Sequence, residues 1–124
     1  MIKKILYIAF KYEYGLEKNG EALNKKAFHN NFIDLGYKVE GVFFENSTKE
    51  ELQKNILKKA KEFKPDIVFF ILQRDQIEID TLKELKKNDF FLVNWFGDDQ
   101  WRLDSFSKNY ALFFDDIITT EKLV

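Results

Sequence analysis

The 124-residue chain carries a formal net charge of −1, contains no cysteine and is 17% aromatic. This length favours one domain with a hydrophobic core, and the lack of cysteine excludes a disulfide framework and thiolate metal sites. The even charge balance lacks the basic footprint of nucleic-acid-binding proteins. Apolar runs such as IVFFIL are too short to span a membrane and no signal peptide is recognisable, so we expect a cytoplasmic protein.

Apolar, β-prone segments alternate along the chain with amphipathic ones. KKILYIAF at 3–10 predicts a buried strand, and the segment 20–37 predicts a helix that ends at Gly36. That helix would turn one face inward, formed by Leu23, Ala27, Phe28, Asn31 and Leu35.

The later part of the chain repeats this alternation. A strand at 38–44 precedes a helix that Ser47 and Glu50 would open as an S-x-x-E capping box and that Pro65 would end. The remaining predicted elements are strands at 66–72, 90–96 and 116–120 and helices at 79–88 and 105–114.

Alternating strands and helices with fully apolar strands predict a three-layer α/β domain, Rossmann-like or flavodoxin-like, with a five-stranded parallel sheet. By analogy with short doubly wound domains we favour the strand order 2-1-3-4-5. The chain stops four residues after the last predicted strand, so the last covering helix is missing. We therefore expect residues 1–124 to form a single domain that is the N-terminal half of a longer protein or is covered by a partner.

Ligands of open parallel sheets bind beyond the carboxyl ends of the strands, and Asp98 and Asp99 follow the fourth predicted strand there. These carboxylates have several possible roles: holding a divalent cation, acting as a general base, or binding a sugar-like ligand on which Trp95 or Trp101 stacks. Alternatively, one Asp caps the next helix or pairs with Arg102 and Trp95 belongs to the core.

Other sites have weaker support in the sequence. His29, the only histidine, is predicted to lie on the solvated face of the first helix. No glycine-rich phosphate loop is present. Phosphoacceptor receiver domains share the βα alternation, but they require an acidic pair after the first strand and an Asp after the third, where this chain has Lys11 and Gln73.

Three segments, KILYIAF (4–10), KPDIVFFILQRDQIEIDTLKEL (64–85) and NWFGDDQWRLDSFSKNYALFFDDIITT (94–120), resemble the N-terminal domain of CgeB-type proteins, which are glycosyltransferase-like proteins of GT-B architecture. The resemblance implies two facing Rossmann-like domains. The N-terminal domain would supply the acceptor side, and a C-terminal domain absent from this chain would bind the nucleotide-sugar donor.

The resemblance therefore predicts the acceptor half of a glycosyltransferase, with no cofactor or metal of its own and inactive alone. Asp98 and Asp99 would orient or deprotonate a hydroxyl-bearing acceptor. The predicted cleft residues are Tyr12, Tyr14, Gln73, Arg74, Trp101 and Arg102. Two alternatives are a non-catalytic module that binds a partner, or a second copy as a homodimer, through the uncovered sheet face, and a small-ligand sensor of flavodoxin-like shape.

Overall fold

The computed structural model describes residues 2–12, 16–22, 25–71, 77–96 and 114–119. Its parallel strands form one sheet in the order β2-β1-β3-β4-β5. The strands are β1 (Lys4–Ala9), β2 (Lys38–Phe43), β3 (Ile67–Phe70), β4 (Leu92–Phe96) and β5 (Asp116–Thr119). The predicted α/β class with a parallel sheet is confirmed, and the strand order is the one favoured by analogy with short doubly wound domains.

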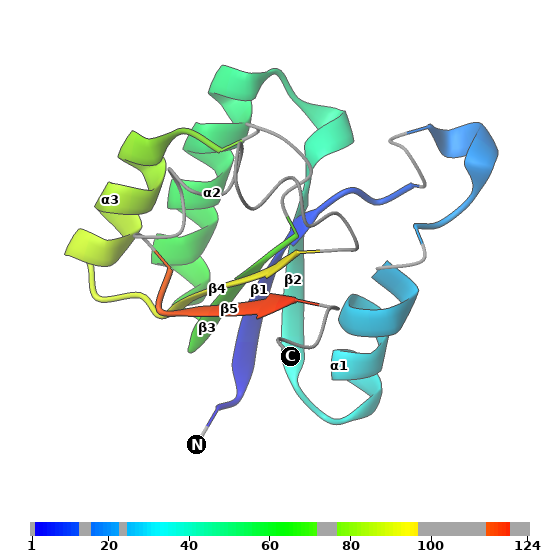
Figure 1. The fold of residues 1–124 in the computed structure, drawn as a ribbon, viewed down its shortest axis with the longest axis horizontal. Coiled ribbons are helices and arrows are strands. Elements are labelled where there is room, and N and C mark those ends of the chain that lie inside the picture. The colour runs from blue at the N-terminus through cyan, green and yellow to red at the C-terminus, as the bar shows by residue number, and fades with distance from the viewer. Residues whose placement is uncertain (1, 13–15, 23–24, 72–76, 97–113, 120–124) are drawn as a thin grey trace.

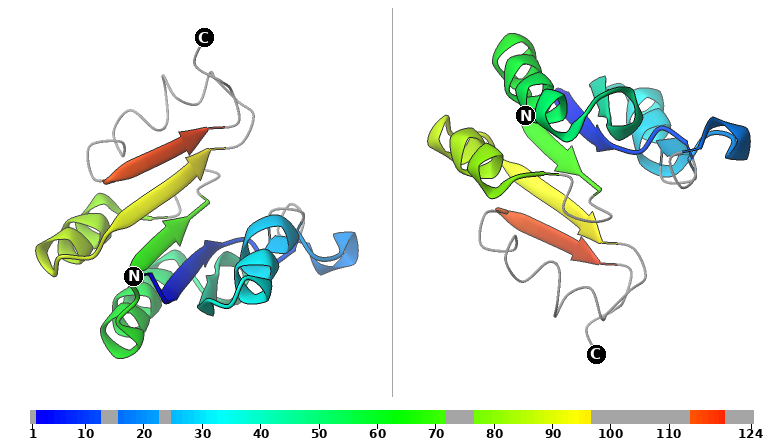
Figure 2. Two further views of the ribbon diagram at one scale, coloured as in Figure 1. Left: turned by 90° about the horizontal axis from the view of Figure 1, so that it is seen from below. Right: turned by 90° about the horizontal axis from the view of Figure 1, so that it is seen from above.

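Helices lie on both faces of the sheet, with α2 and α3 together on one face and α1 on the other (Figure 1). The α-helices are α1 (Asn30–Asp34), α2 (Lys49–Phe63) and α3 (Ile79–Lys87). Shorter helical turns are η2 (Glu17–Asn19) and η4 (Phe44–Asn46), which are 3₁₀, and η3 (Lys25–His29), which is π-helical. The views from below and above show the same layers (Figure 2).

The face under α2 and α3 holds the larger apolar core. Alternate residues of each strand point to this face because side chains alternate along a strand. The buried members are Leu6, Ile8, Val42, Phe44, Leu52, Ile56, Ala60, Val68, Phe70, Ile77, Leu82, Leu85, Leu92 and Phe114.

Helix α2 begins with a capping box, but one residue later than predicted. The Thr48 hydroxyl accepts the Glu51 N–H at 3.2 Å, and the Glu51 carboxylate accepts the Thr48 N–H at 3.0 Å. Ser47 and Glu50 fit the same spacing, so the motif alone could not choose between the two registers. The helix ends as predicted before Pro65, with Lys64 in the left-handed region at φ 52°.

The inward face of the first helix is only partly the predicted one. Phe28, as predicted, and Phe32 pack against Phe69 of β3, with ring centroids at 5.2 and 5.5 Å. In contrast, Ala27, Asn31 and Leu35 are exposed, Leu35 at 69%. Because the π-helical turn η3 has a wider hydrogen-bonding period than an α-helix, the 3.6-residue periodicity assumed for the whole segment fails there.

At the amino ends of the strands, two aspartates bond to the backbone of neighbouring strands. Asp66 accepts the N–H of Lys3 and Lys4 at 2.8 and 2.9 Å, and these bonds lower the pKa of its carboxyl group. Asp115 likewise accepts the Leu92 N–H at 2.7 Å. The helix predicted at 105–114 lies outside the described residues except for Phe114, whose buried ring packs on that of Phe70 at 5.4 Å.

Candidate functional site

The loops after β1 and β2 meet at the carboxyl edge of the sheet, because the two strands are parallel neighbours. The Glu45 carboxylate accepts the backbone N–H of Lys11, with its two oxygens at 3.0 and 2.8 Å, and the N–H of Tyr12 at 2.8 Å. Since backbone donors occupy its oxygens, Glu45 joins the two loops.

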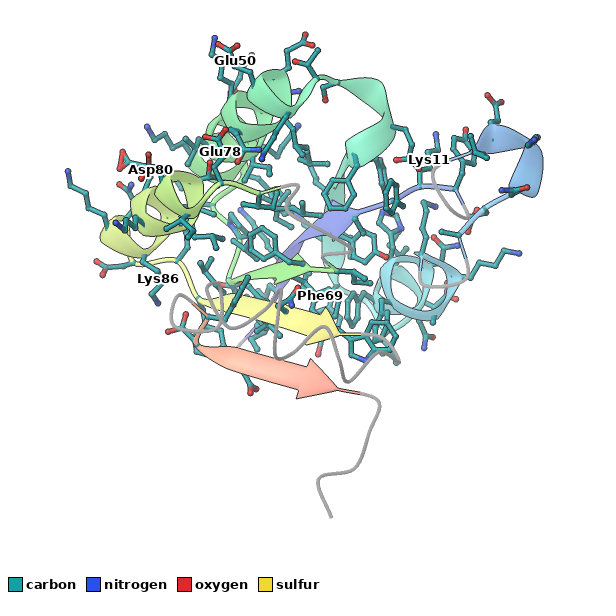
Figure 3. The ribbon with its side chains drawn as sticks, turned by 45° about the horizontal axis from the view of Figure 1, so that its top comes forward. Lys11, Glu50, Phe69, Glu78, Asp80 and Lys86 are labelled. Atoms are coloured by element: carbon teal, nitrogen blue, oxygen red, sulfur yellow. The ribbon has the colours of Figure 1, made fainter. Side chains whose placement is uncertain are left out.

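The chain then returns to the end of β1. Tyr12 and Glu21 form an isolated antiparallel bridge, and the Ala22 N–H donates to the Lys11 carbonyl at 2.8 Å. Lys11 lies at this edge, on the ribbon that continues from β1 (Figure 3). The bridge brings Glu21 and the π-helical turn after it close to the ends of both strands.

Gly41 creates the space for an aromatic ring at this edge. It pairs in register with Tyr7 of β1, and a Cβ atom at Gly41 would overlap the ring of Phe43. The missing side chain therefore lets the Phe43 ring lie back along its own strand. There its centroid is 6.3 Å from that of the Tyr7 ring.

The Phe43 ring is surrounded by cationic and aromatic side chains. The ammonium nitrogens of Lys11 and Lys25 each lie 6.0 Å from its centroid, within the usual range of a cation–π contact. The His29 ring centroid is 5.9 Å away. We call Tyr7, Lys11, Lys25, His29 and Phe43 the Phe43 cluster.

A polar network supports Lys25. Its side chain is only 12% exposed, and its ammonium group lies 3.7 Å from a Glu21 carboxylate oxygen and donates to Asn30 Oδ1 at 3.2 Å. Asn30 Nδ2 in turn donates to Glu21 Oε1 at 2.6 Å. The Glu21 carboxylate is therefore shared between a lysine and an amide.

His29 packs on the sheet and is half-buried, so its predicted position on the solvated face is wrong. Its ring stands edge-on to Tyr7 at 5.3 Å. Burial lowers the pKa of the imidazole, an effect that the Asn30 hydrogen bond and Glu21 oppose and Lys25 reinforces. Because Asn30 Oδ1, 2.9 Å away, is an acceptor, the neutral ring carries its proton on Nδ1.

The Tyr7 hydroxyl has an unusual environment. Tyr7 is fully buried, and among the described residues its hydroxyl has no hydrogen-bond partner. Burial raises the pKa of this phenol, and the Glu21 charge raises it further. Buried hydroxyls in proteins normally have a partner, so this group retains unused hydrogen-bonding capacity at the edge of the Phe43 cluster.

Of the residues that the sequence predicted for the site, the structure describes only Tyr12. Its ring lies 5.5 Å from the Lys11 ammonium nitrogen, and its backbone binds Glu45. The others lie outside the described residues, and their placement stays a prediction: Tyr14, Gln73, Arg74, Asp98, Asp99, Trp101 and Arg102. Trp95 packs on Phe28 at 5.1 Å, which agrees with the core alternative for that side chain.

Sequence reasoning missed Lys25, Phe43 and Glu45. The alternation of β2 could have assigned Phe43 and Phe44 to opposite faces of the sheet. Lys25 could not be found, since its inward orientation depends on the π-helical turn.

Neither a metal site nor a membrane-spanning helix is found in the described parts of the chain. No three His, Cys, Asp or Glu side chains there converge in an arrangement that could hold a metal ion. The helices in the described ranges are also too short or too polar to cross a bilayer.

No family profile and no curated protein sequence matches the chain. Among solved structures, it is similar to the signal receiver domain of a LuxO repressor protein from Vibrio parahaemolyticus, at 12% identity and a TM-score of 0.58, with 98% of this chain and 81% of that one covered. It is also similar to a CheY-like response regulator receiver domain from Methanospirillum hungatei JF-1, at 18% identity and the same TM-score, with coverages of 98% and 84%.

These matches overturn the predicted relation to CgeB-type glycosyltransferases, because the structural neighbours are receiver domains and not glycosyltransferase domains. They also contradict the predicted transferase function, together with its hydroxyl acceptor and C-terminal GT-B partner. The quoted segments carried the resemblance because apolar strands and amphipathic helices recur in every doubly wound domain. The described parts of the chain have an α/β fold with a parallel sheet, consistent with the flavodoxin-like fold of these receiver domains.

Proposed function

We propose that this protein is a signal-receiving domain. It binds a small anionic signal at the carboxyl ends of β1 and β2, and it passes the change to a partner such as an effector domain. The whole-chain similarity to two receiver domains supports the signalling role. One observation favours binding as the input: the described end of β1 carries the Lys11 ammonium group where phosphoacceptor receivers have an acidic pair.

The geometry around Lys11 also favours binding over magnesium-dependent chemistry. Among the described residues, Glu45 is the nearby carboxylate that could replace the acidic pair, but its oxygens accept backbone N–H groups. A magnesium ion needs oxygen ligands with free lone pairs directed at one point. The Glu45 clamp instead fixes the two loops that carry Lys11 and Phe43.

A second candidate is phosphorylation of an aspartate, as the structural neighbours suggest. Along the sequence, Asp75 stands two residues after Gln73, which occupies the position where phosphoacceptor receivers have their Asp, and it lies outside the described residues. In this case the protein would take up a phosphoryl group covalently, and its partner would include a kinase.

One experiment tests both candidates. The protein is incubated with acetyl phosphate and magnesium and then measured by intact mass and by amide hydrogen exchange. The proposal predicts no covalent gain, together with a change in exchange that extends beyond the β1–α1 loop. A mass gain of one phosphoryl group that is lost in Asp75→Asn would establish the second candidate. The absence of both a mass gain and a change in exchange would contradict both candidates.

A further inference from the structure

We propose that the Phe43 cluster is an oxyanion-binding site, in which the Lys11 and Lys25 ammonium groups and the Tyr7 hydroxyl hold a phosphate or carboxylate group. This inference rests on the proposed function and assigns its ligand class and residues. The observation that carries it is that the Lys11 and Lys25 ammonium groups and the Tyr7 ring all lie beside the Phe43 ring, at the ligand-binding edge of a parallel sheet.

Lys11 supplies the first donors. Its half-buried ammonium group has aromatic rings as its neighbours in the described parts of the chain, those of Tyr12 at 5.5 Å and Phe43 at 6.0 Å. The adjacent carboxylate of Glu45 is bonded to main-chain N–H groups. Within the described parts of the chain, the N–H bonds of this ammonium group are therefore available to an oxyanion, and charge-assisted hydrogen bonds of this kind are the strong ones.

Lys25 and Tyr7 supply the other donors. The Lys25 ammonium group is held in place by Asn30 and Glu21, and its burial means that a ligand would meet a positioned cation. The Tyr7 hydroxyl is buried without a partner among the described residues. An oxyanion could accept from both groups, which would remove the cost of an unsatisfied buried donor.

A divalent cation fits these residues less well than an anion. In the described parts of the chain, the carboxylates near the cluster are Glu21, which binds Asn30 Nδ2 at 2.6 Å, and Glu45, which binds backbone N–H groups. Both are already used as acceptors. The unused capacity of the site consists of donors, so it matches a ligand that supplies acceptors.

The test is calorimetric titration of the protein with inorganic phosphate and, separately, with acetate, which distinguishes a phosphate from a carboxylate ligand. We expect Lys11→Gln to weaken binding of the preferred anion about tenfold or more. Lys11→Arg should retain most of the affinity. Lys61→Gln, which makes the same charge change at an exposed position of α2, should bind like the wild type.

Equal affinities of Lys11→Gln and Lys61→Gln, or no binding of either anion, would overturn the inference. If Lys11→Gln does not fold, Tyr7→Phe is measured instead, since that change removes one proposed donor and keeps the ring. An anion affinity of Tyr7→Phe equal to that of the wild type would then contradict the site. If phosphate binds at Lys11 but acetyl phosphate causes no change in hydrogen exchange, the oxyanion site would be supported and the proposed signalling function would be contradicted. If the change in hydrogen exchange persists in Lys11→Gln, the proposed function would be supported and the site at Lys11 would be contradicted.

Discussion

The two faces of the sheet are covered in different ways. Under α2 and α3 the buried residues form a large apolar core. Under α1, aromatic rings meet two lysines, a histidine and a phenol whose hydroxyl has no hydrogen-bond partner in the described parts of the chain. Apolar burial contributes most of the stability of a domain. Polar groups near a sheet's carboxyl edge contribute less stability but can recognise ligands. We therefore assign stability mainly to the α2 and α3 face and ligand binding to the α1 face.

The largest predicted effect comes from the apolar core. Ile56 of α2 is fully buried, whereas Ile33 of α1 is 48% exposed. Ile56→Ala should lower the free energy of unfolding by about 2–5 kcal/mol, because it leaves a cavity. Ile33→Ala should change it by about 0.5 kcal/mol or less. Urea denaturation measures both, and similar losses would contradict the contrast between the faces.

The next effect concerns the polar link between α2 and α3. Gln53 Oε1 accepts the Glu78 N–H at 2.9 Å and the Thr81 hydroxyl at 2.6 Å, and Gln53 is 8% exposed. Gln53→Met keeps the volume but leaves these donors unsatisfied, so we expect a loss of about 1–3 kcal/mol in unfolding free energy. Lys54→Met, at the exposed neighbouring position, is the control. A loss no greater than that of the control would mean that the link is dispensable.

How well the sequence predicts structure also differs between the faces. For α2 and α3, the alternation of apolar strands with amphipathic helices predicted the fold class and the elements. The strand order came only from analogy with short doubly wound domains. Even there, STKEE offers two overlapping capping boxes, and only the structure selects Thr48 and Glu51. Local motifs thus predict that a helix is present more reliably than they predict the residue at which it begins.

On the α1 face, sequence periodicity fails for a physical reason. The π-helical turn at Lys25–His29 shifts which residues face the sheet, and it moves His29 inward and Leu35 outward. No composition signal marks such a turn. The site was also missed because its residues come from three segments far apart in the sequence, and their meeting depends on the backbone contacts of Glu45.

A smaller effect, of opposite sign, is predicted for Tyr7. Tyr7→Phe removes a buried hydroxyl without a partner in the described chain, so the unfolding free energy should rise by about 1 kcal/mol. Tyr37→Phe, a half-buried position packed on Phe32, is the control for loss of a hydroxyl. The measurement is the midpoint of urea unfolding without ligand. Destabilisation by Tyr7→Phe would show that the hydroxyl is already bonded within the protein.

His29 should make stability depend on pH. Its pKa in the folded protein is lowered, mainly by burial, so the unfolded chain binds the proton more readily. The wild type should thus lose stability as the pH falls below the unfolded value of about 6.5, and the loss should level off below the folded pKa. His29→Gln should lack this loss between about pH 8 and about pH 5. Equal pH profiles for the two proteins would contradict the burial of the imidazole.

The smallest effect is expected for an ion pair at the edge of the well-packed face. Glu40 of β2 and Lys59 of α2 lie 2.8 Å apart, and their side chains are 42% and 37% exposed. The hydrogen bond to Glu40 raises the pKa of Lys59, but water screens a pair this accessible. Glu40→Gln should therefore cost about 1 kcal/mol or less, and less still at high salt. A larger loss, unaffected by salt, would mean that α2 is attached to β2 by this pair as much as by Ile56 and its apolar neighbours, and the contrast between the two faces would then need revision.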